Sequence, residues 1–460
     1  MISKISFMKS LFILPLLFAI ISCTAQSPNQ ETVFTKVNVI PMNEEKVIKN
    51  QDVVVQNGII TAIGESGKVK YSKNARVIDA NGKYLMPGLA EMHAHVPPVD
   101  DIEPMKEVLT LFLCNGITTI RGMLGHPRHL ELRSKIQSGE IIGPHFYTSG
   151  PSFSGNSVKT PEAGSEMVRN QKQAGYDFLK FHPGLTKENF AAIAKTAKEV
   201  NIPFAGHVSF DVGVWSAIEA GYASIDHLDG FVESLVPGLD TIKEQQTGPF
   251  AMYIAKNADE KRIPALMKAL KEKNIWVVPT QALAERWFSP DKDADAFARE
   301  PEMIYMKEET LKNWITNKKN LMANPNFKTE DIRKFVEIRR KLIYECQRNG
   351  VGLLLGSDGP QVFNVPGFSV HHELKYMVDA GLTPFQALQS GTVNVAKYFN
   401  LTNSGMIKTG YVSDMVLLDA NPLENIENTK KIAGVMLGNT WLAKDIIKTD
   451  LKFLEKPRSF

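Results

Sequence analysis

The chain has 460 residues, of which 43% are hydrophobic and 22% are charged, and its formal net charge is +3 at pH 7. This length supports one large domain with a smaller one, or two domains. The ordinary composition excludes a largely disordered protein. The near balance of charge argues against the clustered basic surface of a nucleic-acid-binding protein, so no nucleic-acid partner is expected.

The N-terminal residues have the pattern of an export signal. Two lysines precede the apolar run Leu11–Ile21, which is about half as long as a membrane span. The following Ser22-Cys23 resembles the site at which bacterial lipoproteins are cleaved and lipidated. We therefore predict a signal peptide over residues 1–22 and a lipid on Cys23, with an ordinary signal peptide as the alternative. The expected location is the periplasm or outer membrane, and the expected membrane contact is this anchor alone.

Both ends of the mature chain carry short β-branched runs separated by turn residues. Asn57-Gly58 separates two such runs near the N-terminus, and similar runs return at Asp414–Asp419 and Ile432–Leu437. This pattern of short strand-forming runs separated by turns is typical of a small all-β unit. We therefore predict that residues 31–86 and 402–455 form a small β-sandwich domain.

Between these ends, short apolar runs alternate with helical patterns. Eight such runs occupy residues 85–95, 117–123, 145–148, 178–182, 203–208, 224–228, 275–280 and 352–358. Alternation of this kind predicts a parallel sheet, and eight units is the number in a TIM barrel. The predicted fold class is therefore α/β, with a (β/α)8 TIM barrel over residues 87–401. Within it, Thr383-Pro384 has the pattern of a helix start.

Residues 284–345 are longer than one crossover helix needs. They contain Arg286, Trp287, Phe288 and Trp314 together with many charges. Long insertions after a barrel strand are often lids, and a surface helical hairpin is an equally good interpretation. The segment is predicted to be one of these two.

A pair of histidines, His93 and His95, lies at the end of the first predicted barrel strand. Residues two apart in a strand point to the same face, so both imidazoles can reach one metal ion. Histidine pairs on strands are also common as hydrogen-bonded core residues. However, four other strands end in chemically competent residues: Lys180, His207, His227 and Asp358. TIM barrels place active sites at that end of their strands, so the sequence predicts one metal site at the barrel mouth.

This layout resembles the amidohydrolase superfamily. Pro87-Gly88-Leu89 leads into the histidine pair, and the runs Asn115–Ile120 and Gly391–Ala396 are also similar. The resemblance covers essentially the whole mature chain and is nearest to the imidazolonepropionase-like and prolidase-like branch. Glu91 departs from the pattern, since many members have aspartate at that position.

The resemblance implies a binuclear centre with two divalent metal ions. One ion would take His93, His95 and Asp358, the other would take His207 and His227, and a carboxylated Lys180 would bridge them. An unmodified lysine is a cation and cannot ligate a metal ion, whereas its carbamate is an anion with two oxygens. The alternative, a structural cation at Lys180, would place an isolated charge at an apolar strand end, which is costly. Imidazole and carboxylate ligands favour zinc.

The function implied by the resemblance is hydrolysis of a carbon–nitrogen bond in a small molecule, namely an amide, a cyclic amide or a dipeptide. A hydroxide bridging the two ions would attack the carbonyl carbon. Asp358 would also serve as general acid and base, with a purely ligating role as the alternative. Arg121 and His182 are candidate substrate-binding residues. A structural ion pair is the alternative for Arg121, and a core position is the alternative for His182.

Other functions fit the same ligands. Esters, lactones and phosphotriesters present centres that the same hydroxide can attack. A binding protein that holds the metal ions without catalysis belongs to a different class, although all six ligand positions carry competent residues. Deamination is disfavoured, because Phe210 stands where related deaminases have a glutamate. No sequence feature predicts an oligomeric state.

Overall fold

The computed structural model describes residues 30–457. The predicted signal peptide, the lipidation of Cys23 and the export that they imply concern residues outside this range and stay predictions. Within the described range, no helix is long and apolar enough to cross a membrane. Both cysteines of that range, Cys114 and Cys346, are free and buried.

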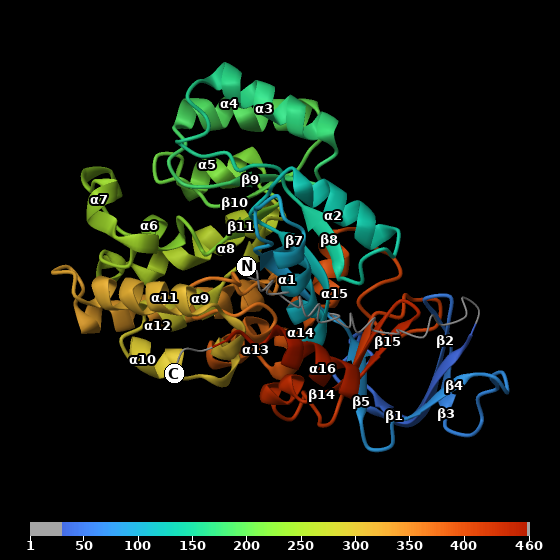
Figure 1. Ribbon diagram of the computed structural model, residues 1–460. Coiled ribbons are helices and arrows are strands. Elements are labelled where there is room, and N and C mark those ends of the chain that lie inside the picture. Colours follow the sequence, from blue (N-terminus) through green and yellow to red (C-terminus); the bar gives the residue numbers. More distant parts are fainter. Residues whose placement is uncertain (1–29, 458–460) are drawn as a thin grey trace, which may run out of the picture.

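Strands from the two ends of the chain join one eight-stranded sheet. Its members are β1 (Thr32–Val39), β2 (Ile48–Gln56), β3 (Ile59–Glu65), β4 (Arg76–Asp79), β5 (Tyr84–Pro87), β13 (Met415–Leu418), β14 (Ile432–Leu437) and β15 (Thr440–Ala443). The order is β15-β14-β13-β5-β1-β2-β3, with β4 paired to β1. Figure 1 shows the blue N-terminal strands beside the red C-terminal elements.

This sheet differs from the two facing sheets that a β-sandwich would have. The strand β5 pairs in parallel with β1 and antiparallel with β13, so it connects the two sets of strands edge to edge. One apolar cluster draws on both sets, and within it the rings of Phe34 and Trp441 meet edge to face at 5.1 Å. The structure therefore assigns the predicted strands to one mixed sheet.

The larger part of the chain contains two parallel sheets. One contains β6 (Leu89–Ala94), β7 (Ile117–Gly122) and β8 (His145–Thr148), and the other contains β9 (Leu179–Phe181), β10 (Phe204–Gly206), β11 (Ser224–Asp226) and β12 (Trp276–Val278). Every pair of neighbouring strands in them is parallel. With helices between the strands, this is a TIM-barrel-like α/β arrangement.

The eighth predicted barrel strand, residues 352–358, is not assigned as a strand. It nevertheless makes hydrogen bonds on both sides, because Leu354 N donates to Val277 O at 2.9 Å and Met92 N donates to Leu355 O at 2.8 Å. Isolated parallel bridges join Val277 to Leu353 and Ala94 to Gly359. The two parallel sheets do not form one closed sheet, because they are joined only by isolated bridges both here and between the segments of β8 and β9, where Ser149 pairs with Phe178 and Phe153 with Phe181.

Helices follow most of these strands. The helices of this part are α1 (Glu103–Cys114), α2 (Arg128–Gln137), α3 (Pro161–Ala174), α4 (Lys187–Glu199), α5 (Gly213–Ala220), α6 (Phe231–Leu235), α7 (Glu244–Thr247), α8 (Ile263–Glu272), α9 (Gln281–Leu283), α13 (Phe368–Asp379), α14 (Pro384–Ser390) and α15 (Val393–Tyr398), and α16 (Lys444–Leu454) follows β15. In α4, Phe190, Ile193 and Ala197 recur at helical spacing and are buried. The predicted start of α14 is confirmed, since Thr383 and Gln386 form a capping box.

The insertion at residues 284–345 contributes to the core as well as to the surface. It contains a π-helical turn (Ala284–Phe288), α10 (Ala294–Ala298), α11 (Glu308–Met322) and much of α12 (Thr329–Asn349). Arg286 and Phe288 are each 1% exposed, and α12 buries Phe335 and Leu342. A simple surface hairpin does not describe this segment, and a role as a lid stays a prediction.

Candidate metal centre

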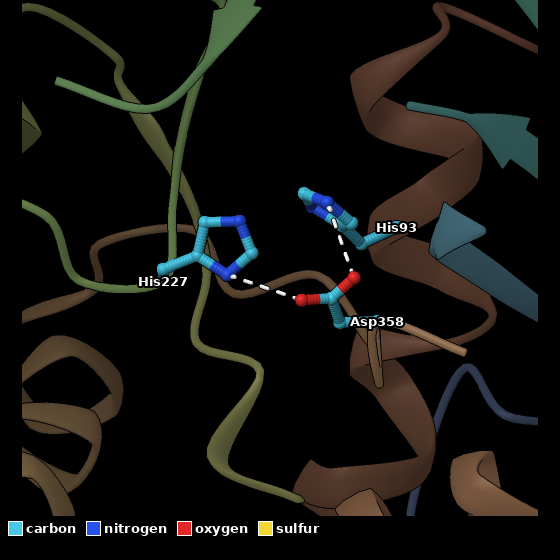
Figure 2. Close-up of side chains that lie close together, drawn as sticks. All are labelled: His93, His227 and Asp358. Carbon is cyan, nitrogen blue, oxygen red and sulfur yellow. Dashed lines mark ion pairs between the residues drawn. The ribbon is translucent and has the colours of Figure 1, made fainter. Parts of the chain in front are cut away.

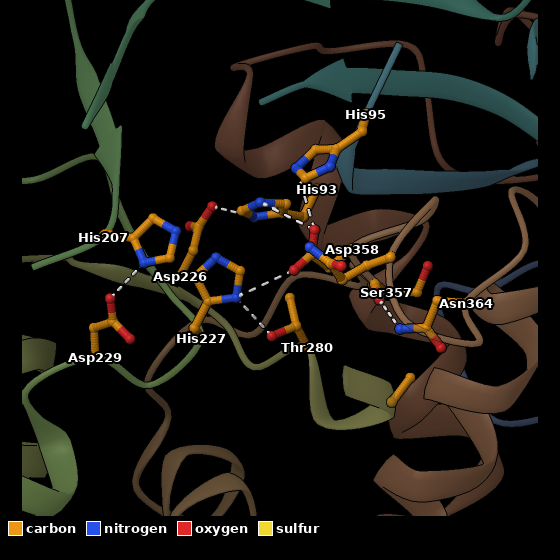
Figure 3. A network of polar contacts seen from close by, with 12 residues as sticks. His93, His95, His207, Asp226, His227, Asp229, Thr280, Ser357, Asp358 and Asn364 are labelled. Atoms are coloured by element: carbon orange, nitrogen blue, oxygen red, sulfur yellow. Dashed lines mark hydrogen bonds and ion pairs between the residues drawn. The ribbon is translucent and has the colours of Figure 1, made fainter. Parts of the chain in front are cut away.

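Six predicted ligand residues come from the ends of five barrel segments. His93 lies in β6 and Lys180 in β9, while His95, His207 and His227 are the first residues after the strands β6, β10 and β11. Asp358 ends the segment that lies between β12 and β6. Figure 3 shows the four histidines and the aspartate facing a common centre.

Asp358 lies between histidines from opposite sides of the site. Its Oδ1 is 3.1 Å from Nε2 of His95 and 3.8 Å from Nε2 of His93, and its Oδ2 is 3.9 Å from Nδ1 of His227. Figure 2 shows Asp358 between His93 and His227. Ligand atoms of these last three residues all lie within 4.8 Å of one another, which is close enough for one ion. This group of three combines His93 and Asp358, which the resemblance assigned to one ion, with His227, which it assigned to the other.

The remaining two predicted ligands adjoin this group. Nζ of Lys180 lies 3.4 Å from Nε2 of His93. The ring of His207 stacks on that of His227 with centroids 4.2 Å apart. The structure therefore brings all six predicted residues into one cluster.

Several polar atoms at the centre of the cluster are buried without a hydrogen-bond partner. They are Nε2 of His95, Nε2 of His227 and Oδ1 of Asp358. Leaving buried polar atoms unpaired is costly, and each such atom calls for an explanation. Imidazole nitrogens and carboxylate oxygens are ligands of zinc and similar ions. The donor set therefore fits divalent metal ions.

Three of the histidines have their Nδ1 atom within hydrogen-bond distance of a neighbouring side chain. Nδ1 of His93 lies 2.7 Å from Asp226, Nδ1 of His207 lies 2.7 Å from Asp229, and Nδ1 of His227 lies 2.9 Å from Thr280. Because a carboxylate only accepts, Nδ1 of His93 and of His207 carries the proton. This leaves Nε2 of both rings with a lone pair for a metal ion.

Asp226, Asp229 and Thr280 were not predicted from the sequence. The two aspartates flank His227 in the run from Ser224 to Asp229, and Thr280 ends the predicted strand at 275–280. Carboxylates next to a candidate ligand were the available signal. Sequence alone does not say which histidine each carboxylate reaches, and Asp226 in fact contacts His93 from another strand.

The backbone adopts an uncommon conformation at three of these residues. His227, Thr280 and Asp358 have φ values of 64°, 48° and 63°, in the left-handed region. Such conformations cost free energy for non-glycine residues and concentrate at functional sites. Gly206 is needed for a related reason, because a Cβ there would lie 2.6 Å from Phe181 O and 2.8 Å from Cδ of Lys180.

Burial dominates the electrostatics of the cluster. It raises the pKa of Asp358 to about 7, against the opposing effect of Lys180. It lowers the pKa of His95 to about 3, with a further contribution from Lys180, so the imidazole is neutral and able to ligate. It also lowers the pKa of Lys180 to about 8, while Asp226 and Asp358 act in the opposite direction. An ammonium at Lys180 would therefore not be the isolated charge that the sequence suggested.

Arg121 does not have the placement expected of a substrate-binding residue. Its side chain is 0% exposed. Its Nε donates to Met92 O at 2.8 Å, its Nη1 donates to Ser224 Oγ at 2.9 Å and to Tyr398 Oη at 2.8 Å, and its Nη2 reaches both oxygens of Asp226 at 3.3 Å. Arg121 therefore holds β6, β11 and Asp226 together inside the barrel.

His182 and Glu91 both lie beside the ligands. The half-buried ring of His182 stacks on His207 at 5.1 Å, so its predicted contact with substrate stays a prediction. Glu91 is fully buried, and it accepts hydrogen bonds from His93 N at 2.8 Å and from both N and Oγ of Ser357. Glu91 thereby connects β6 with the residue that precedes Asp358.

Comparison with known proteins gives the family of the chain. The sequence model of the Amidohydrolase family matches residues 84–442, so the chain belongs to this family. Ochratoxinase of Aspergillus niger is 22% identical over 451 residues, which span 83% of this chain and 79% of the relative. The predicted superfamily is confirmed.

Solved structures show the same fold. Bottromycin amidohydrolase superimposes with a TM-score of 0.69 at 20% identity, covering 92% of this chain and 90% of that one. A Xaa-Pro dipeptidase with methionine bound in its active site gives a TM-score of 0.64 at 18% identity, covering 90% of this chain and 100% of the other. By its family model the chain is an amidohydrolase, and these solved structures share its fold.

Proposed function

We propose that this amidohydrolase is metal-dependent and hydrolyses a carbon–nitrogen bond in a small amide, cyclic amide or dipeptide. The observation that supports this most directly is the set of buried, unpartnered atoms on His95, His227 and Asp358. They belong to a cluster of neutral imidazoles and a carboxylate, which is the donor set of a hydrolytic zinc site. Two divalent ions, with zinc as the expected metal, would be held by His93, His95, Lys180, His207, His227 and Asp358.

Bound metal ions would supply Lewis acidity and lower the pKa of water. The chain's own residues do the rest. Asp226 and Asp229 keep the protons of His93 and His207 on Nδ1, so the opposite nitrogens face the centre. Oδ1 of Asp358 is buried and unpartnered, and from that position it can accept a proton from the attacking water and deliver it to the leaving nitrogen.

Lys180 would take part as its carbamate. The neutral amine attacks the carbon of carbon dioxide, a nitrogen–carbon bond forms, one carbon–oxygen π bond breaks with its electron pair moving to oxygen, and the nitrogen releases a proton to water. The product is an anion with two oxygens that can ligate. Support comes from the placement of Nζ, which lies beside Nε2 of His93 at the end of a fully buried side chain whose carbons pass close to Gly206.

The substrate class follows from the family and from the relatives. The named activities of the similar proteins include a dipeptidase and an amidohydrolase, and both cleave carbon–nitrogen bonds. We extend this class to the present chain. The half-buried His182 is retained as a proposed contact to substrate, whereas Arg121 is not, because its donors are taken up inside the barrel.

We also infer that residues 87–401 form a single (β/α)8 barrel and that the mature chain is exported with a lipid on Cys23. The first inference is supported by the hydrogen bonds of residues 352–359 to β12 and β6. The second is supported by the sequence pattern of residues 1–22. Incorporation of labelled palmitate tests the second inference. We expect label on the wild-type chain and none on Cys23→Ala.

An activity panel tests the proposed function. Zinc-loaded protein is incubated with dipeptides, N-acyl amino acids, cyclic amides, carboxylic esters, lactones and phosphotriesters, and products are measured by mass spectrometry. We expect turnover of a carbon–nitrogen substrate that Asp358→Asn abolishes and Asp445→Asn, at an exposed residue of α16, does not change. Turnover of esters or phosphotriesters alone would favour the rival hydrolases. Bound metal without turnover would favour a binding protein.

A further inference from the structure

An aromatic side chain lies against the histidines of the candidate metal centre. The ring centroid of Phe250 is 5.5 Å from that of His227 and 6.3 Å from that of His207. Phe250 belongs to the segment between β11 and α8, outside the predicted ligand set. Its side chain is half-buried, as is that of His207, so this side of the centre meets solvent.

The backbone that carries this ring is strained. Phe250 and Ala251 have φ values of 51° and 63°, and Gly248 has 70°. Consecutive non-glycine residues in the left-handed region persist only where the surrounding structure holds them, and they concentrate at active sites and ligand clamps. Phe250 packs against the main hydrophobic core, and its strained backbone beside two metal-ligand candidates makes it a candidate for a further role in binding.

Phe250 begins a row of aromatic rings that leads away from the centre. Phe288 is 5.4 Å from Phe250, and Trp287 stacks on Phe288 at 5.0 Å. Phe288 is buried, whereas Trp287 is half-buried, and its Nε1 is enclosed without a hydrogen-bond partner in the described structure. We call Phe250, Phe288 and Trp287 the aromatic row. Its last two members come from the insertion at residues 284–345.

We propose that the aromatic row selects the substrate of this enzyme: Phe250 packs against an aromatic or other flat apolar group next to the scissile carbon–nitrogen bond. This inference rests on the proposed function. Aromatic rings favour edge-to-face or offset contacts and exclude water from the group that they cover. Phe250 already touches His207 and His227, so a ring that packs on it lies directly beside the reacting bond.

Binding measurements test this inference without requiring turnover. Zinc-loaded protein is titrated by calorimetry with benzohydroxamate and with acetohydroxamate, which share a metal-binding head and differ in their apolar group. We expect benzohydroxamate to bind the wild-type chain at least about tenfold more tightly, the scale at which an apolar pocket discriminates. Phe250→Ala should remove this preference and Phe250→Tyr should retain it. Phe453→Ala, at a phenylalanine that is 86% exposed on α16, should change nothing.

Kinetics then separate this inference from the proposed function. We expect N-benzoyl amino acids to be hydrolysed with higher kcat/KM than N-acetyl amino acids, and Phe250→Ala to raise KM for the benzoyl series alone. Equal binding of the two hydroxamates, or an unchanged preference in a folded Phe250→Ala, would overturn the aromatic selection and leave amide hydrolysis standing. Absence of turnover on every amide, with the benzohydroxamate preference intact, would overturn amide hydrolysis and leave the aromatic contact at Phe250 standing.

Discussion

Oδ2 of Asp226 lies 2.7 Å from Nδ1 of His93, and both side chains are buried. Arg121 reaches both oxygens of the same carboxylate at 3.3 Å, so Asp226 is fixed from behind while it orients the histidine. Carboxylates in this position set the tautomer and the direction of a metal-binding imidazole. Arg121 in β7, Asp226 in β11 and His93 in β6 therefore form a chain of contacts that ends at the candidate metal centre.

Replacement of Asp226 by Asn should weaken metal binding. An asparagine amide can turn its nitrogen toward Nδ1, so it no longer holds the proton on that atom. The affinity for the metal ion should therefore fall by about 10- to 100-fold. Competition with a chromogenic chelator measures this loss, with Asp445→Asn as the control at a side chain that is 95% exposed. Unchanged affinity in Asp226→Asn would show that His93 needs no orienting partner.

Replacement of Arg121 by Lys should destabilise the fold and, in the metal-loaded protein, leave substrate affinity unchanged. Lysine cannot reproduce the fork that serves Met92 O, Ser224, Tyr398 and Asp226, and breaking such a buried network costs about 3 kcal/mol or more. Urea unfolding measures the loss, with the exposed Arg333→Lys as control. A raised KM at unchanged stability would instead restore the substrate-binding role that the sequence suggested.

Replacement of Lys180 by Ala should reduce the metal content. On the proposed function this substitution removes the carbamate that would help to hold the metal ions, so purified protein should hold fewer than about two ions per chain. Lys318→Met is a matched control at another buried lysine, whose Nζ donates to three backbone carbonyls of residues 286–289. That variant should lose stability and keep its metal. Full occupancy and full activity in Lys180→Ala would contradict the bridging role.

An ion pair between the barrel and the small sheet should make stability depend on pH. Nε2 of His145, in β8, lies 2.8 Å from Asp414, and this contact raises the pKa of His145. The stabilisation is therefore complete below the ordinary histidine pKa of about 6.5, and it is lost as the pH rises through the raised value. Because the His145 side chain is 58% exposed, screening keeps the effect below about 1 kcal/mol.

The test of this ion pair is urea unfolding of His145→Gln at two pH values. The variant should be less stable than the wild type at about pH 5.5 and equally stable at about pH 9, where His145 is neutral in both states. The exposed ion pair of Lys273 and Glu219 offers a control. The stability of Lys273→Gln relative to the wild type should be the same at both pH values. An equal loss at both pH values would mean that His145 acts through packing.

Much of the fold could be predicted from periodicity, and the exceptions have physical causes. The strand expected at 145–148 is β8 to the residue, and the run at 432–437 is β14. The run at 352–358 is as apolar as the other barrel strands, but its contacts to either side are single bridges. Whether a segment forms a full ladder or a single bridge depends on its spacing from the neighbouring strands, and the local sequence does not encode that spacing. The joining of β5 to β13 is a contact across more than 300 residues, equally invisible to local pattern.

The site divides in a similar way. His93, His95, Lys180 and Asp358 were predictable because histidines, a lysine and an aspartate at strand ends are rare in apolar runs. The orienting residues were not, since Asp226 serves a histidine on another strand. For Arg121 the sequence left two interpretations open, because an arginine at a strand end fits a substrate carboxylate as well as a buried carboxylate. Its contacts with Asp226 match the second interpretation, the structural ion pair.

The most direct test of a metal-dependent hydrolase at this centre is a titration of metal-free protein with zinc. Metal content per chain and hydrolysis of the amide found in the activity panel are measured on the same samples. We predict no hydrolysis without metal and a rise that reaches its plateau at about two ions per chain. Full hydrolysis by the metal-free protein, or metal uptake that leaves hydrolysis unchanged, would contradict the account.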